Sequence, residues 1–315
     1  MAAVAILGCG GDGDDESAAT PPPVARPEDF PAPAGRSLRE LQRKYGMGGP
    51  VLAPAMKSLQ LGKNRFGFGL FTRSREQIAD APVALYLAPV AGGAARGPYV
   101  TRYESLKVEP QYLSRSVSAD KDAAKSVYVA DLEFKKPGRY YVLGLTRLDD
   151  RLVAASPAGP PLEVMKDDPV PDVGDKAPRT HTPTRASVGG DLAKIDTREP
   201  PSEMHEEDFA EVLGKKPVVL LFATPALCQS RVCGPVVDIA EQVRAKYPDD
   251  AAWIHMEIYN DNEVEQGFRP QVVQWSLPSE PWVFTVDRKG RIAAKIEGAY
   301  SANELEAALK KAIGD

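Results

Sequence analysis

Two cysteines, Cys228 and Cys233, follow a short apolar run and lie five residues apart. The run Val218–Phe222 has the length and composition of a strand that is buried on both faces. Pro225 ends it, and an amphipathic helix follows, with apolar residues at Val236, Ile239, Ala240, Val243 and Tyr247. A thiol between a strand and a helix N-terminus lies at the positive end of the helix dipole, which favours the reactive thiolate. The pattern therefore predicts thiol chemistry.

The spacing of the two cysteines limits how they can meet. On a continuous helix five residues turn by about 500°, so the two side chains would diverge. A pair therefore requires Cys228 in the loop and Cys233 in the first helical turn. Pro235 suits that arrangement, because proline is favoured at the start of a helix. With Cα atoms within about 7 Å of each other, the two cysteines could form a disulfide.

The elements around the cysteines are expected to alternate between strands and helices. A helix over 202–213, with Gly214 at its C-terminus, precedes the apolar run. After the cysteine helix we expect a strand over 251–259 and a partly helical stretch over 263–275. Two further strands, over 282–287 and 291–297, are expected to be joined by a tight turn. A final helix is expected to begin with a Ser301–Glu304 capping box. This order is β-α-β-α-β-β-α.

That order, and several local strings, resemble the thioredoxin-like superfamily over roughly 173–313. Phe222-Ala223-Thr224 followed by a cysteine is similar to the Phe-Trp-Ala-x-Trp-Cys string of that family. Cys233-Gly234-Pro235 matches its Cys-Gly-Pro, although Val236 stands where the second cysteine is expected. The segment 173–178 resembles the lead-in of extracytoplasmic thioredoxin-like reductases and peroxiredoxins. Pro281 lies before a strand, where the family has a cis-proline, so the resemblance implies a cis Glu280–Pro281 bond facing the thiols.

Three roles for the cysteine pair remain open. In the first, Cys228 is the nucleophile, Cys233 resolves the mixed disulfide, and Arg231 and Pro235 modulate the pair. In the second, the pair is a permanent structural disulfide, as is common outside the cytoplasm. In the third, the thiols bind a metal, as in the Sco-type copper proteins that share this fold. The Cys-Gly-Pro string would instead make Cys233 the reactive residue; we favour Cys228, because the helical cysteine is usually the buried one.

Two observations weigh on these alternatives. The histidine pattern of a Sco-type site is missing, since His255 is expected to pack inside a strand and His181 and His205 to lie on the surface. We therefore expect no metal and no cofactor. No buried acid precedes the cysteines of the kind that thioredoxins use for proton transfer.

The region 51–166 is expected to form an all-β, immunoglobulin-like sandwich. Short strands are expected at 59–61, 65–71, 83–87, 99–103, 127–134, 140–146 and 162–165, separated by Gly and Pro turns. Pro137-Gly138 and the residues after it resemble the penultimate strand of immunoglobulin-like or fibronectin-like bacterial modules. The region contains no His or Cys, and its carboxylates are scattered as on a solvated face. It is expected to be a spacer or a protein-binding module.

The N-terminus contains the third cysteine. Ile6-Leu7-Gly8-Cys9 resembles the lipobox of bacterial lipoproteins, which implies lipidation of Cys9. The apolar segment is short and no Lys or Arg precedes it, as in a truncated signal. The Gly-, Asp- and Pro-rich residues that follow are expected to form a flexible tether up to about residue 50, apart from a short helix at 36–47.

The composition sets the remaining limits. The 315 residues are 43% hydrophobic and 26% charged, with a net charge of −5. The absence of a basic stripe argues against nucleic-acid binding, and no apolar run is long enough for a membrane-spanning helix. We expect a tether (1–50), a sandwich (51–166), a linker (167–200) and a thioredoxin-like domain (201–315). The predicted function is thiol–disulfide exchange with protein substrates, outside the cytoplasm and on a lipid anchor; the alternative is a non-catalytic binding or scaffold lipoprotein with a structural disulfide.

Overall fold

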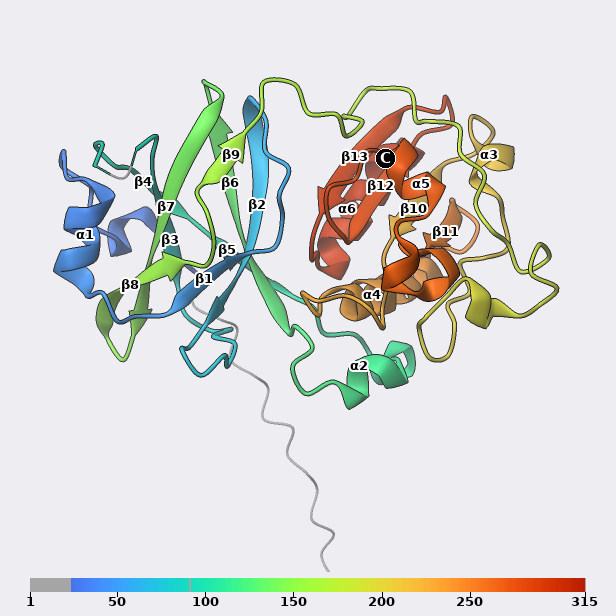
Figure 1. Ribbon diagram of the computed structural model, residues 1–315, viewed down its shortest axis with the longest axis horizontal. Helices are drawn as coiled ribbons and strands as arrows, with labels where there is room; N and C mark the ends of the chain where they lie inside the picture. Colours follow the sequence, from blue (N-terminus) through green and yellow to red (C-terminus); the bar gives the residue numbers. More distant parts are fainter. Residues whose placement is uncertain (1–23, 91, 315) are drawn as a thin grey trace, which may run out of the picture.

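The computed structural model describes residues 24–90 and 92–314, so Cys9 and the lipobox lie outside the described residues. The chain forms a β-rich domain followed by an α/β domain, and the two lie side by side (Figure 1). Within the described residues, no helix combines the length and the apolar character needed to cross a membrane.

The first domain is built from one sheet whose strands run in the order β4-β3-β7-β8-β1-β2-β6-β5, with β9 paired to β7. Buried residues of β2 and β6 share a core with those of β3 and β7, so the sheet folds over itself into two layers. The strands are β1 (Val51–Pro54), β2 (Gly62–Phe71), β3 (Val83–Ala88), β4 (Arg96–Val100), β5 (Arg102–Ser105), β6 (Ser126–Phe134), β7 (Gly138–Leu148), β8 (Arg151–Pro157) and β9 (Leu162–Val164).

Several details of this domain differ from the sequence-based expectation. The parallel pair β1 and β8, which joins the two layers, was not predicted. Residues 59–61 form no strand; Gln60 makes only an isolated bridge to Met165. The segment expected to be a tether up to residue 50 packs on the domain from about residue 25, because the helix α1 (Leu38–Tyr45) buries Leu38 and Leu41 against the sheet.

The second domain contains a four-stranded sheet in the order β11-β10-β12-β13. The central strand β10 pairs parallel to β11 and antiparallel to β12, and β12 pairs antiparallel to β13. This is the strand arrangement of a thioredoxin-like fold, as predicted. The elements are α3 (Phe209–Val212), β10 (Val218–Phe222), α4 (Cys233–Lys246), β11 (Ala252–Met256), α5 (Pro270–Gln274), β12 (Trp282–Val286), β13 (Ile292–Glu297) and α6 (Ala302–Ile313).

Two cores cover the faces of this sheet. Residues of α4 and α6 pack on one face, and those of α3 and α5 pack around Trp275 on the other. Every residue of β10 is buried, as expected for its continuous apolar sequence. The capping box predicted at the start of the last helix is confirmed, since Ser301 accepts a hydrogen bond from the Glu304 amide and Glu304 accepts one from the Ser301 amide.

The helix predicted over 202–213 is wrong for its first half. Only Phe209–Val212 is helical, with Asp208 as its N-cap. The Ser202 amide instead donates to Asp196 (2.6 Å) and the Glu203 amide to Glu241 (2.6 Å). These carboxylates hold the backbone amides in an extended path, so the segment has contacts that a helix would have to break.

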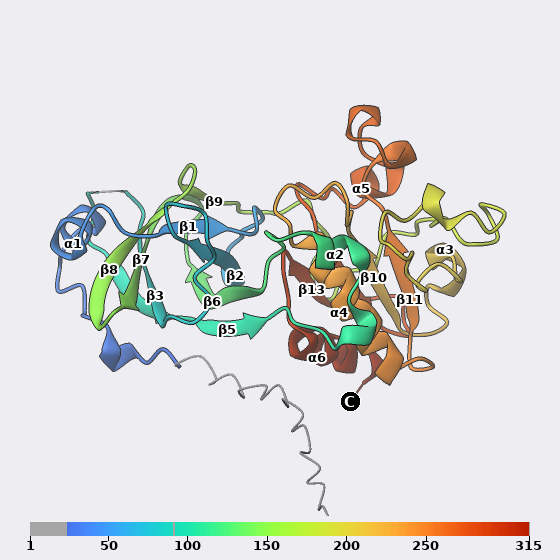
Figure 2. The same ribbon diagram turned by 90° about the horizontal axis from the view of Figure 1, so that it is seen from below.

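The two domains share contacts along one side of the α/β domain. The segment between β5 and β6, which contains α2 (Arg115–Ala119), reaches across to α4 (Figures 1 and 2). Leu106, Val127 and Val129 of this β-rich part are buried in the same core as α4. Arg65 of β2 also forms a bidentate ion pair with Glu304 of α6. The β-rich domain therefore packs directly against the α/β domain.

Candidate active site

The loop between β10 and α4 brings the two cysteines together. The Leu227 amide donates to the Thr224 carbonyl (3.3 Å) and the Arg231 amide to the Cys228 carbonyl (3.2 Å), so the chain turns twice within the loop. Arg231 adopts a positive φ of 56° at the second turn. Cys228 therefore lies in the loop and Cys233 is the first residue of α4, as the spacing predicted. Both cysteines are free in the structure.

The partly exposed thiol of Cys228 is strongly acidic. A hydrogen bond from the Cys233 thiol lowers the pKa of Cys228 to about 6, helped by Ser230 and by the Val232 and Cys233 amides, against the opposing effect of burial. The Ser230 hydroxyl lies 3.2 Å from the Cys228 sulfur. Donors at a helix N-terminus stabilise the thiolate because they place positive charge beside it. At neutral pH the Cys228 side chain is therefore mostly thiolate.

Cys233 has the opposite character. It is fully buried, and burial raises the pKa of its thiol well above the ordinary value, with Cys228 raising it further. The Thr224 amide acts in the other direction. A buried protonated thiol in contact with an accessible thiolate is the asymmetry that a resolving and an attacking cysteine require. This division of roles agrees with the choice of Cys228 as the nucleophile.

The acidity of Cys228 predicts a distinctive pH profile. The rate of alkylation by iodoacetamide should rise through a midpoint near pH 6, whereas the midpoint for an ordinary cysteine thiol is at about pH 8.5. Because the thiolate is the reacting form, the rate falls as the pH drops below that midpoint. Ser230→Ala should move the midpoint upward, since it removes a donor to the thiolate. A wild-type midpoint near 8.5, measured by mass spectrometry of the Cys228 peptide, would contradict this assignment.

The segment before β12 brings an acid to the thiols. The Glu280–Pro281 bond is cis, as predicted. Burial raises the pKa of the half-buried Glu280, and the neighbouring Cys228 raises it further, while Lys57 lowers it. Glu280 in turn raises the pKa of Cys233. The carboxyl that acts on the thiols therefore comes from the segment before β12, whereas β10, ahead of the cysteines, contains only apolar residues.

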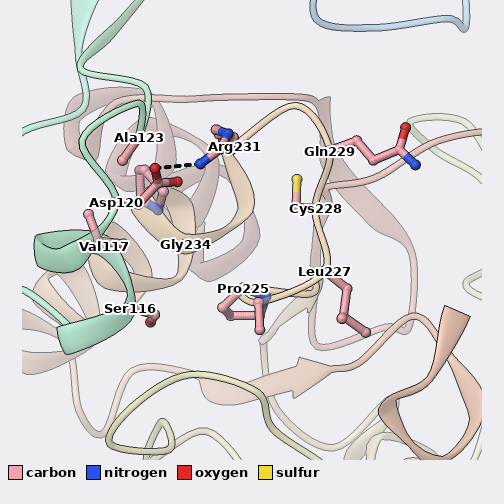
Figure 3. A pocket seen from close by; sticks show the side chains of 12 residues that line it. Ser116, Val117, Asp120, Ala123, Pro225, Leu227, Cys228, Gln229, Arg231 and Gly234 are labelled. Carbon is pink, nitrogen blue, oxygen red and sulfur yellow. Dashed lines mark hydrogen bonds and ion pairs between the residues drawn. The ribbon is translucent and has the colours of Figure 1, made fainter.

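The β-rich domain supplies one wall of the site. A cavity of about 400 Å³ is lined on one side by Ser116, Val117 and Asp120 of the α2 segment and on the other by residues 225–229 and Arg231 of the thiol loop (Figure 3). Val117 approaches the first turn of α4 so closely that a Cβ at Gly234 would lie 2.7 Å from its side chain. Asp120, taken from the sequence as a solvated carboxylate, therefore borders the thiol site.

Arg231 turns toward that wall. Its guanidinium forms an ion pair with Asp120, drawn as a dashed line in Figure 3, and its carbonyl accepts the Ala124 amide at 3.1 Å. Cys233, Ser230 and backbone amides are the main groups that lower the pKa of Cys228. The contacts of Arg231 join the thiol loop to the α2 segment.

A buried ion pair holds the α2 segment on α4. The Asp238 carboxylate of α4 accepts hydrogen bonds from the Ser114 amide (2.9 Å), the Ser114 hydroxyl (3.0 Å) and the Arg198 guanidinium (2.8 Å). The same guanidinium donates to the Tyr112 carbonyl at 2.8 Å. Arg198, from the predicted linker, thus helps to hold the α2 segment beside α4.

The structure brings together most of the predicted site residues. Cys228 and Pro235 line the cavity beneath the α2 segment, the buried Cys233 thiol contacts Cys228, and Glu280, which precedes Pro281, acts on the pKa of Cys233. Sequence reasoning missed Glu280 and Asp120. An acid next to a predicted cis-proline was a signal that could have identified Glu280, whereas nothing local to Asp120 marks it. His205 is buried, which corrects its prediction as a surface residue, while His181 is exposed.

Comparisons with known proteins give partial similarities. No family model matches the chain, and no curated protein matches it. Among solved structures, a thiol:disulfide interchange protein described as DsbE, from Chlorobium tepidum, is 18% identical, with a TM-score of 0.34; the match covers 46% of this chain and 99% of that one. A thioredoxin family thiol:disulfide interchange protein from Chlorobium tepidum TLS is 15% identical, with a TM-score of 0.32, covering 45% and 99%.

Proposed function

We propose that this protein is a thiol–disulfide oxidoreductase that acts on protein thiols outside the cytoplasm through the Cys228–Cys233 pair. The observation that carries the proposal is the asymmetry of the two thiols: an accessible Cys228 with a pKa of about 6 contacts a buried, protonated Cys233. The cis Glu280–Pro281 bond supports it, because the Glu280 carboxyl raises the pKa of Cys233 and has its own pKa raised by Cys228.

The reaction begins at the accessible sulfur. The Cys228 thiolate attacks one sulfur of a substrate disulfide, forms a mixed disulfide, and releases the other substrate sulfur as a thiolate. Cys233 then gives up its proton and attacks the Cys228 sulfur. This step forms the Cys228–Cys233 disulfide and releases the second substrate thiolate. Two electrons pass from the dithiol to the substrate, and the same steps in reverse oxidise a substrate dithiol; the relative potentials set the direction.

Glu280 is placed to handle the proton in the second step. Cys233 is buried, so water does not reach its thiol. The Glu280 carboxylate, whose pKa is raised by burial and by the nearby Cys228, can accept the proton as Cys233 attacks. In the reverse direction the protonated carboxyl returns it.

The β-rich domain narrows the range of substrates in this proposal. We assign it as an immunoglobulin-like sandwich whose α2 segment borders the cavity beside Cys228. An extended segment of a protein substrate can enter between α2 and the thiol loop, whereas a folded surface cannot approach Cys228 from that side. The lipobox-like residues that end at Cys9 would anchor the chain to the membrane, and this part of the proposal depends on the sequence pattern alone.

The reduction potential tests the proposal. A working couple should equilibrate with glutathione at a potential above about −300 mV, because stabilisation of the Cys228 thiolate favours the reduced form. The alternative of a scaffold lipoprotein with a structural disulfide requires a lower value. The experiment uses the full-length chain recovered from the membrane fraction, so that mass spectrometry of its N-terminal peptide also tests for acylated Cys9. A potential below −300 mV would reject the enzymatic function, and an unmodified Cys9 would reject the anchor.

A further inference from the structure

A second cluster of ligating side chains lies buried beneath the thiol loop. It consists of Asp196, His205 and His255, whose side chains are 0–1% exposed. One ligand atom from each lies within 4.8 Å of the others. His255 belongs to β11, whereas the other two come from the extended segment that precedes α3. Two parts of the chain that are far apart in the sequence therefore meet at one buried point.

The cluster lies on the face of the sheet that carries the cysteine helix. Along β11, Ile254 packs in the core around Trp275, whereas Trp253 packs in the core that contains Cys233. Side chains alternate along a strand, so His255 points to the same face as Trp253. Its ring also contacts the thiol loop directly, since His255 Nε2 lies 3.0 Å from the Ala223 carbonyl oxygen.

Four atoms converge with the spacing of a metal coordination shell. Asp196 Oδ2 lies 2.8 Å from His205 Nε2 and 3.3 Å from His255 Nδ1. The Ser202 hydroxyl lies 3.2 Å from each of the same two nitrogens. Ligands at 2.0–2.1 Å from a tetrahedral zinc ion are separated from one another by about 3.3 Å. The separations of 3.2 and 3.3 Å are close to that value, and the Asp196–His205 separation of 2.8 Å is shorter.

The hydrogen-bonding roles of these atoms favour a cation between them. A carbonyl oxygen only accepts, so His255 Nε2 must carry a hydrogen toward Ala223. Nδ1 is then the ring nitrogen that faces the Asp196 carboxylate, at 3.3 Å. A metal ion between them would take Nδ1 and the carboxylate oxygen as ligands, and a carbonyl that holds the far nitrogen of a ligating histidine is the usual second contact of such sites.

Asp196 is a buried carboxylate, so its charge must be compensated by groups of the cluster itself. Among the described residues, no lysine or arginine side chain is paired with Asp196; its other partners are the backbone amides of Arg198 and Ser202. The Nε2 atom makes the polar contacts of the His205 ring, whereas its buried Nδ1 has no hydrogen-bond partner in the described part of the chain. The burial of His205 is therefore explained by the contacts of Nε2 with Asp196 and Ser202.

We propose that Asp196, His205 and His255, with the Ser202 hydroxyl as the fourth group, bind a divalent transition-metal ion. Imidazole and carboxylate ligands suit Zn²⁺, and a site closed by four protein groups is structural rather than catalytic. The ion joins the segment before α3 to β11 and, through the Ala223 carbonyl, supports the loop that carries Cys228. This site is separate from the thiols, so it does not depend on the proposed exchange activity.

The test is metal content after refolding. The full chain is unfolded in chelator, refolded with or without Zn²⁺, freed of loosely bound ions, and analysed by mass spectrometry of its metals and by thermal unfolding. We expect about one Zn²⁺ per chain and an unfolding midpoint at least about 5 °C higher with zinc. His205→Gln should lose the ion. His181→Gln should retain it, and it is the matched control because His181 lies in an exposed group with Asp208 and Glu211.

Further measurements distinguish zinc binding at Asp196, His205 and His255 from binding at the thiols and from no binding. If His205→Gln does not fold, refolding the wild-type chain with Co²⁺ supplies the evidence, because a tetrahedral nitrogen and oxygen site gives intense visible absorption without a sulfur charge-transfer band. A wild-type chain that refolds without zinc to the same midpoint and binds none overturns the proposal. So does an ion that survives His205→Gln but is lost in Cys228→Ser, which would place it at the thiols.

Discussion

Serine at Cys233 is expected to trap this protein in a mixed disulfide with its substrate, whereas serine at Cys228 should reduce thiol exchange to the level of a protein-free blank. The difference follows from the two environments. Cys228 is accessible and mostly thiolate at neutral pH, so it forms the bond to the substrate. Cys233 is buried and protonated, so its task is to release that bond. The measurement is a disulfide-containing model protein incubated with each variant, followed by non-reducing electrophoresis and mass spectrometry.

The third cysteine of the chain provides the matched control. Cys9→Ser keeps both thiols of the site and should exchange at the wild-type rate. A covalent complex that forms through Cys233 in the Cys228→Ser variant would reverse the assignment of the nucleophile. The Cys-Gly-Pro string makes Cys233 the alternative nucleophile. Mass spectrometry of the cross-linked peptide identifies which of the two cysteines has reacted.

Methionine at Arg198 is expected to lower the free energy of unfolding by about 3–5 kcal/mol, the usual result of leaving one partner of a buried ion pair uncompensated. The Arg198 and Asp238 side chains are only 7% and 1% exposed, so water cannot replace the guanidinium. Methionine keeps much of the apolar stem and removes the charge. The measurement is urea unfolding, monitored by fluorescence, of the wild-type chain and the variant.

An exposed pair supplies the control for this substitution. Arg185 and Glu206 are 44% and 60% exposed, so Arg185→Met should change stability by less than about 1 kcal/mol. The Arg198 variant should also label faster at Cys228, because Asp238 holds Ser114 at the start of the α2 segment. Equal small losses in the two variants would show that the interface between α2 and α4 does not depend on this pair.

Local patterns sufficed for the elements that carry the cysteines. The strand Val218–Phe222 was predicted with its observed bounds, because five consecutive buried apolar residues have few alternatives. The position of Cys233 in the first helical turn followed from helix geometry, and the cis Pro281 followed from the family resemblance. In each case the signal lies within a few residues of the feature.

The helix predicted over 202–213 shows where local reasoning fails. Its residues have acceptable helical propensity, yet the amides of Ser202 and Glu203 bind carboxylates from other parts of the chain. Those carboxylates belong to Asp196 and Glu241, and the latter is 38 residues away. A propensity of a few tenths of a kcal/mol per residue does not outweigh hydrogen bonds to buried charged groups.

Local sequence was enough to predict that a strand, a thiol loop and a helix N-terminus follow one another, and hence that Cys228 lies in the loop and Cys233 in the helix. The groups around the two thiols depend on how distant segments pack. Asp120, from the other domain, lines the cavity beside Cys228, and Glu280, 47 residues beyond Cys233, acts on the pKa of Cys233. Backbone preferences act over a few residues, whereas burial and charge pairing depend on which distant segments come together.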